Sequence, residues 1–391
     1  MKKNLFILLF LGFLTLNAQT YTAGSRYFGR NNYIEYRAGN LPIIISAPHG
    51  GRLEPTAIPD RNCATCTTVM DGNTMELAYQ IDTAIQQVFG CFPHIVVNQL
   101  HRIKLDANRE IVEAALGNTD AETAWGEWHN FIQNAKNQAK NAFGRGLLID
   151  LHGHGHTIQR LEIGYLPNET DLRLSDSVLS TPQYSRLLSI KNLVLNNLNR
   201  FTAAQLLRGE FALGTLLGAK NFPSVPSQQD PAPLVGELYF NGGYNTFRHG
   251  SRDSSTIDAL QIECNFTGVR NTYENRRRFA TELATALKTY FAKHYFVTPI
   301  NCRTATTETT GLGVHISPNP VQNSLTIAFD APQSGSFDCR VFNMQGQQIL
   351  QKTMVLNAQN DGLLDVSSLN SGLYFLKMKD VILKFCVNSN R

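Results

Sequence analysis

Short apolar runs alternate with stretches of helical periodicity over most of the chain. Four runs have the length and apolar content of buried strands, at 41–46, 93–98, 146–151 and 259–265. Apolar residues spaced three and four positions apart predict helices between them, near 75–88, 121–142 and 274–294, with a leucine-rich helical region at 171–218. Strands that alternate with helices predict an α/β fold, with a mostly parallel, mixed sheet flanked by helices.

The pattern changes near both ends of the chain. Lys2 and Lys3 precede an apolar run that ends in small and polar residues, which predicts a signal peptide at 1–18. A threonine-rich linker is expected at 299–313, after a catalytic domain at 20–298. From 314 to 391, short alternating strands separated by turn residues predict a small β-sandwich.

Composition excludes two classes of function. The formal charge is only +4, from 35 basic and 31 acidic residues, so no basic footprint for nucleic acid is expected. No later run approaches the ~20 apolar residues of a transmembrane span, so the exported protein is expected to lack one. Export permits disulfides, and a local bond between Cys63 and Cys66 is the preferred interpretation of that pair among the seven cysteines.

Candidate chemistry collects where the predicted strands end. His49 and His152 both follow apolar runs and both stand beside glycine, which suits a zinc site at the carboxyl edge of a sheet. Glu263 ends an apolar strand, where burial would raise its pKa toward that of a general base. Arg102 and Arg109 could bind an anionic substrate. Taken singly, each of these residues also has a structural explanation, as an ion-pair partner or a solvated turn residue.

Five motifs in order carry a resemblance to a known family. They are Ser46-Ala-Pro-His49-Gly-Gly, Leu105-Asp-Ala-Asn108-Arg109, Asp150-Leu-His152, Asn241-Gly-Gly-Tyr244 and Gln261-Ile-Glu263. This part of the chain resembles the N-formylglutamate amidohydrolase family, within the zinc carboxypeptidase and aspartoacylase superfamily. The resemblance implies zinc bound by His49, an acid and His152. It also implies a substrate carboxylate held by Asn108 and Arg109, and a catalytic Glu263.

The acidic metal ligand departs from the superfamily pattern. Carboxypeptidases carry a glutamate three residues after the first histidine, where this chain has Arg52. Asp71, at the start of the following helix, is the preferred ligand, and Glu54 remains the rival because its spacing resembles poly-γ-glutamate hydrolases. Arg102 is expected to stabilise the oxyanion. Tyr244 and His154 are expected to contact substrate; if the backbone stays extended, His154 shares a strand face with His152.

The C-terminal segment resembles the sorting domain of the type IX secretion system. Three motifs carry this resemblance: Ile316-Ser-Pro-Asn-Pro320, Val341-Phe-Asn-Met-Gln-Gly346 and Leu369-Asn-Ser-Gly-Leu-Tyr-Phe-Leu-Lys377. It implies export by that machinery, followed by release or attachment at the cell surface. A sandwich that binds carbohydrate is the structural alternative for this segment.

Together the patterns predict an exported zinc-dependent hydrolase that cleaves an amide in an N-acyl amino acid, peptide or cell-wall fragment. Two alternatives stay open. One is a catalytically inactive surface binding protein of the same fold, and the other is a hydrolase of esters or of poly-γ-glutamate.

Overall fold

The computed structural model describes residues 21–297, 300, 314–329, 333, 335–343, 347–357, 361–379 and 381–388. The chain divides into two compact units between Ile300 and Asn301, each with its own core. The predicted signal peptide, and the predicted linker apart from residue 300, lie outside the described residues. No helix in the described part of the chain is long and apolar enough to cross a membrane.

The first unit is built on an eight-stranded sheet with the order β1-β2-β4-β3-β5-β8-β6-β7. Its strands are β1 (Arg26–Phe28), β2 (Ile34–Arg37), β3 (Ile43–Ala47), β4 (His94–Asn98), β5 (Gly146–His154), β6 (Leu161–Gly164), β7 (Ser224–Val225) and β8 (Ile257–Asn265). The central pairs β4–β3, β3–β5 and β5–β8 are parallel, as is β6–β7. The remaining pairs are antiparallel, which confirms the predicted mixed, mostly parallel sheet.

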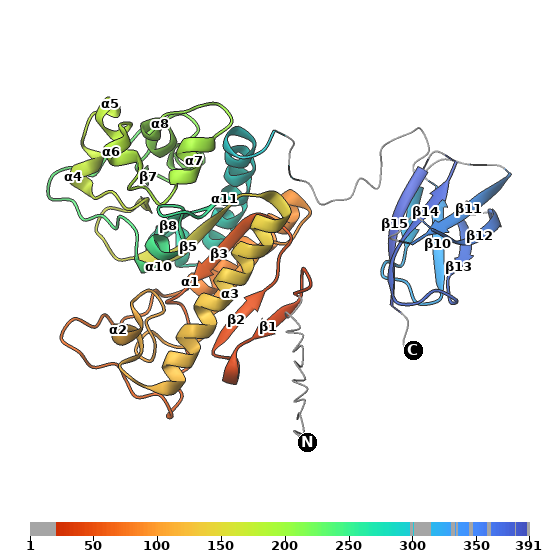
Figure 1. Cartoon of the computed structure of the whole chain (residues 1–391), viewed down its shortest axis with the longest axis horizontal. Helices are drawn as coiled ribbons and strands as arrows, with labels where there is room; N and C mark the ends of the chain where they lie inside the picture. The colour runs from red at the N-terminus through yellow and green to blue at the C-terminus, as the bar shows by residue number, and fades with distance from the viewer. Residues whose placement is uncertain are drawn as a thin grey trace, which may run out of the picture. The chain divides into compact units, whose positions relative to one another are not determined.

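Three long helices cover this sheet (Figure 1). They are α1 (Thr74–Phe89), α3 (Thr119–Phe143) and α11 (Tyr273–His294). Buried residues of α3 share one core with Ile44, Val96 and Leu148 from three neighbouring strands, so α3 covers that face. α1 contacts strands β3, β4 and β5 and packs against α11. All three helices fall within two residues of the ranges predicted from their periodicity.

The shorter helices and turns belong to the connections. The leucine-rich region forms six short helices rather than long ones: α4 (Glu169–Leu172), α5 (Asp176–Leu179), α6 (Pro182–Ser185), α7 (Lys191–Asn196), α8 (Ala203–Arg208) and α9 (Leu213–Gly218). Others are α2 (Ile111–Ala115), α10 (Tyr244–His249), a 3₁₀ turn at Arg30–Asn32 and a π-type turn at Phe266–Arg270. In Figure 1, α4–α8 gather around β7 as a lobe beside the sheet.

The second unit consists of two antiparallel sheets, as predicted for a β-sandwich. One sheet has the order β13-β10-β9 and the other β12-β11-β14-β15. Their strands are β9 (Val314–Ser317), β10 (Ser324–Phe329), β11 (Ser336–Phe342), β12 (Gln348–Val355), β13 (Asp361–Asp365), β14 (Gly372–Met378) and β15 (Val381–Val387). Buried residues from both sheets form one apolar cluster, which includes Leu325, Val341 and Phe385.

Candidate metal centre

Strand β5 extends further than its apolar run predicts. The apolar run predicts a strand over 146–151, but β5 pairs with β8 residue by residue up to His154 and Asn265. The long partner strand continues the ladder through the glycine and histidine positions. His152 therefore has a backbone fixed by sheet hydrogen bonds, and it lies directly opposite Glu263.

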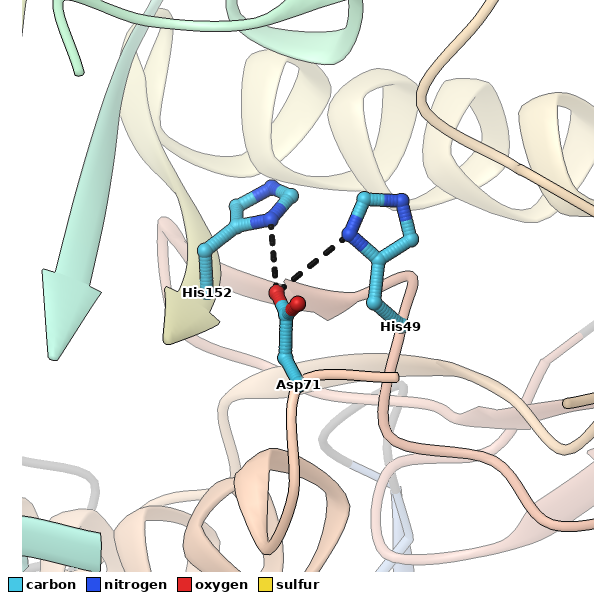
Figure 2. Close-up of side chains that lie close together, drawn as sticks. All are labelled: His49, Asp71 and His152. Carbon is cyan, nitrogen blue, oxygen red and sulfur yellow. Dashed lines mark hydrogen bonds and ion pairs between the residues drawn. The ribbon is translucent and has the colours of Figure 1, made fainter. Parts of the chain in front are cut away.

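Three buried side chains converge at the carboxyl edge of this sheet: His49, Asp71 and His152 (Figure 2). His49 follows β3, Asp71 precedes α1, and His152 lies in β5. The Asp71 Oδ2 atom is 3.3 Å from His49 Nδ1 and 3.2 Å from His152 Nδ1. The Gly153 backbone N–H also donates to this oxygen at 3.2 Å.

The outer nitrogen of each histidine is bound to a second carboxylate. His49 Nε2 lies 2.7 Å from Asp106 Oδ1, and His152 Nε2 lies 2.7 Å from Asp150 Oδ2. Each of these aspartates is fully buried. When Nε2 carries the proton and donates it to the carboxylate, the Nδ1 lone pair faces Asp71, an arrangement common among zinc-binding histidines.

The cluster fits a divalent cation. A bound cation would replace the protons that His49 and His152 share with the Asp71 carboxylate, and each Nδ1 would then offer its lone pair to the ion. Burial alone would raise the pKa of Asp71, but His49 and His152 hold that pKa below its usual range, so Asp71 is a carboxylate. Two imidazoles and one carboxylate form a known catalytic zinc set with an open position.

Glu54, the rival acidic ligand, is exposed and lies outside this cluster. Asp71 reaches the histidines because Asn73, not Asp71, occupies the helix N-cap position. The Asp71 backbone carbonyl accepts a hydrogen bond from the Thr74 hydroxyl. The Asp71 side chain does not cap the helix. The Asp71 backbone N–H donates to the His49 carbonyl at 3.0 Å, which ties the two segments together.

A cavity of about 630 Å³ opens beside the cluster. Its lining includes eight of the nine residues predicted for the site: His49, Asp71, Arg102, Asn108, Arg109, His152, His154 and Glu263. Burial raises the pKa of Glu263 to about 8, and the Gln261 side chain donates to its carboxylate at 2.8 Å. The wall also contains apolar side chains, among them Val69, Phe240 and Phe266.

Tyr244 is not among the cavity-lining residues. It begins α10, and its hydroxyl accepts a hydrogen bond from Arg248 at 2.6 Å while its ring contacts that of His129. Gly242 and Gly243, which precede it, do line the cavity. Its neighbour Asn245 instead supports the site, because its N–H donates to Asn108 Oδ1 and its side-chain amide to Asp150.

The two arginines have different surroundings. Arg102 is buried, donates to Asp106 at 3.0 Å and lies 3.6 Å from Asp71 Oδ1. Arg109 is about one-third exposed, and it bonds to Glu113 and to the Asn108 carbonyl. Arg109 is therefore the more available of the two for a ligand, whereas Arg102 balances the carboxylates behind the cluster.

Arg270 supports the site but was not predicted. Its buried guanidinium donates to the backbone carbonyls of Cys264, His154 and Gly72, which belong to β8, β5 and the segment that carries Asp71. A Cβ at Gly153 would clash with this guanidinium, so glycine is required for the close contact. Asp106 and Asp150 lie in motifs that carry the family resemblance, and Arg270 follows the last of these motifs. No local sequence pattern predicts the contacts that the three residues make.

Comparisons with known proteins identify the second unit. The family model for the secretion system C-terminal sorting domain matches residues 315–385. This unit is a sorting domain. This match indicates that the protein is handled by the type IX secretion machinery and is then secreted or attached at the cell surface.

The first unit has more distant likenesses. A search of curated proteins found no significant match. Among solved structures, N-formylglutamate amidohydrolase from Ralstonia eutropha JMP134 is similar at 13% identity and a TM-score of 0.41, covering 66% of this chain and 95% of that one. AaCel9A in complex with cellobiose-like isofagomine matches at 14% identity and a TM-score of 0.17, over 19% of this chain and 14% of that one.

Proposed function

We propose that this protein is a secreted zinc-dependent hydrolase that cleaves an amide bond in an N-acyl amino acid, a peptide or a cell-wall fragment. The observation that carries the proposal is the convergence of His49, Asp71 and His152 beside a cavity that also contains Glu263. The carboxylates behind both histidines support zinc as the ion. A zinc ion held there would lower the pKa of water and polarise a carbonyl.

Glu263 is proposed as the general base. It is nearly buried, lines the cavity and stands opposite His152 in the β5–β8 ladder. Its carboxylate would take a proton from the attacking water and pass that proton to the leaving amine. The Gln261 amide fixes one carboxylate oxygen, so the side chain keeps its direction as the proton moves.

Asn108 and Arg109 are proposed to hold a substrate carboxylate. The Asn108 side chain is fixed by the Asn245 N–H and lies 3.4 Å from His152, so it stands next to the cluster. Arg109 adds a guanidinium that can bind a carboxylate with two parallel hydrogen bonds. Arg102, paired with Asp71 and Asp106, is proposed to stabilise negative charge on the reacting oxygen.

The test uses the full chain and measures zinc content and turnover together. Glu263→Gln should keep its zinc and lose about 10²–10⁴-fold in kcat on the best substrate from a panel of N-acyl amino acids, dipeptides, esters and poly-γ-glutamate. Glu210→Gln, an exposed site outside the cavity, is the matched control. An unchanged turnover rate in Glu263→Gln refutes the role of Glu263 as general base. A wild type with zinc but no turnover on the whole panel favours a binding protein.

A further inference from the structure

A second group of metal-binding side chains lies beyond the first. Its members are His154, His156 and Glu162, whose ligand atoms all lie within 4.8 Å of one another. His154 ends β5, His156 follows it by two residues, and Glu162 lies in β6. Both histidines line the same cavity as the first cluster.

The hydrogen bonds around this group orient its donor atoms. His154 Nε2 lies 2.8 Å from the Arg160 carbonyl, so it carries the proton and leaves Nδ1 as an acceptor, which takes the His156 backbone N–H at 3.1 Å. Glu162 Oε2 accepts the Phe240 N–H at 2.7 Å, and Oε1 lies 2.7 Å from His156 Nδ1. The ring of His156 stacks on that of Phe240. Metal-binding histidines and carboxylates are held in place by partners of this kind.

The charge around Glu162 also favours a cation. Glu162 is buried and stands directly opposite Glu263 in the antiparallel β6–β8 ladder, and its charge is one of the causes that raise the pKa of Glu263. Arg160, close in sequence, is committed to Asp230 and Glu237. A divalent ion next to Glu162 would offset the negative charge of this buried carboxylate.

We propose that His154, His156 and Glu162 form a second binding site for zinc or a similar divalent metal ion. Binding would release the proton shared by His156 Nδ1 and Glu162 Oε1 and replace the 3.1 Å hydrogen bond from the His156 N–H to His154 Nδ1. Gly155 lies between the two histidines, and a glycine has the widest choice of backbone conformations for such an adjustment. The site uses none of the residues of the first cluster, and its existence does not depend on the proposed reaction.

The experiment is equilibrium dialysis of the full chain against buffered Zn²⁺, with metal content measured by mass spectrometry. Wild type is expected to bind about two ions per chain, one for each three-ligand set. Glu162→Gln, which keeps an acceptor for the Phe240 N–H, should bind about one fewer, whereas the exposed control Glu210→Gln should match wild type. His156→Phe provides an independent variant, because it keeps the stack on Phe240 and changes a partly exposed side chain.

The outcomes separate the two sites. If Glu162→Gln and His156→Phe both bind as much zinc as wild type, the second site is refuted. A single ion in wild type that Asp71→Asn removes also refutes it and leaves the first cluster intact. If Asp71→Asn loses nothing while His156→Phe loses an ion, the second site stands and the zinc chemistry proposed for the first cluster is wrong.

Discussion

Replacing Asp150 by asparagine tests whether the carboxylates behind the histidines tune the metal centre. Asp150 is fully buried and uses both oxygens. One accepts the Ser46 hydroxyl at 2.6 Å and the Asn245 amide at 3.3 Å, and the other lies 2.7 Å from His152 Nε2. An asparagine has the same shape but only one acceptor oxygen, so its NH₂ must face either His152 or the Asn245 amide, both donors.

The expected loss follows from these contacts. A hydrogen bond to a charged group contributes about 1.5–3 kcal/mol, and a donor set against a donor loses that contribution. Loss of an outer carboxylate partner lowers metal affinity by about 10–100-fold, or about 1.4–2.7 kcal/mol. We therefore expect Asp150→Asn to raise the zinc Kd by a factor within that range.

The assay is competition with a chromophoric chelator on the full chain. Asp258→Asn is the matched control, because Asp258 is equally buried in β8 and accepts from Ser251, Tyr295 and the Leu193 N–H, away from the cluster. Asp258→Asn should keep the wild-type Kd. An Asp150→Asn protein with wild-type zinc affinity would refute the role given to the outer carboxylates.

Three further predictions concern substrate binding and stability. Arg109→Lys should raise KM about 10–100-fold for substrates with a free carboxylate, with little change for carboxamide analogues, because a two-point contact is lost. Burial lowers the pKa of Lys136 from 10.5 to about 8, so Lys136→Met should stabilise the fold by up to about 3 kcal/mol below pH 8. Replacing both Cys63 and Cys66 by serine should cost about 2 kcal/mol of unfolding free energy, because their bond closes a short loop.

The measurements for these follow directly. Steady-state kinetics on paired carboxylate and carboxamide substrates test Arg109, and equal KM effects on both would contradict its role. For Lys136, the folded state binds fewer protons than the unfolded state between about pH 8 and 10.5. The free energy of unfolding of wild type should therefore rise with pH in this range and approach that of Lys136→Met. The Lys136 prediction is refuted if urea unfolding gives a stability difference between wild type and Lys136→Met that does not change with pH. The disulfide prediction is wrong if the serine variant unfolds at the same urea concentration as wild type.

Periodicity predicted the sheet and the long helices because burial imposes a repeat on the sequence itself. The apolar runs of β3, β4, β5 and β8 needed cover on both faces, and the three long helices provide it. The lengths of the strands were harder to predict than their positions. The Gly-His run of β5 looks like a loop in isolation, and only its pairing with β8 extends it as a strand.

The candidate site was predictable as far as its side chains end strands or begin helices. The choice between Asp71 and Glu54 required the path of the loop between β3 and α1, which local sequence does not encode. The support from Asp106 and Arg270 depends on distant segments. Asp106 meets His49 across 57 residues, and Arg270 meets Gly72 across 198. Tyr244 does not line the cavity, although the two glycines before it do, so its contact with substrate stays a prediction.

The three side chains of the first cluster come from separate parts of the sequence. Asp71 is 22 residues from His49 and 81 from His152. An unfolded chain would have to close both loops before these three side chains could bind one ion together. Affinity for the metal therefore appears only once the edge of the sheet has formed. For an exported chain, metal loading would thus report the completion of folding, and it would take place wherever along the export route the sheet finally forms.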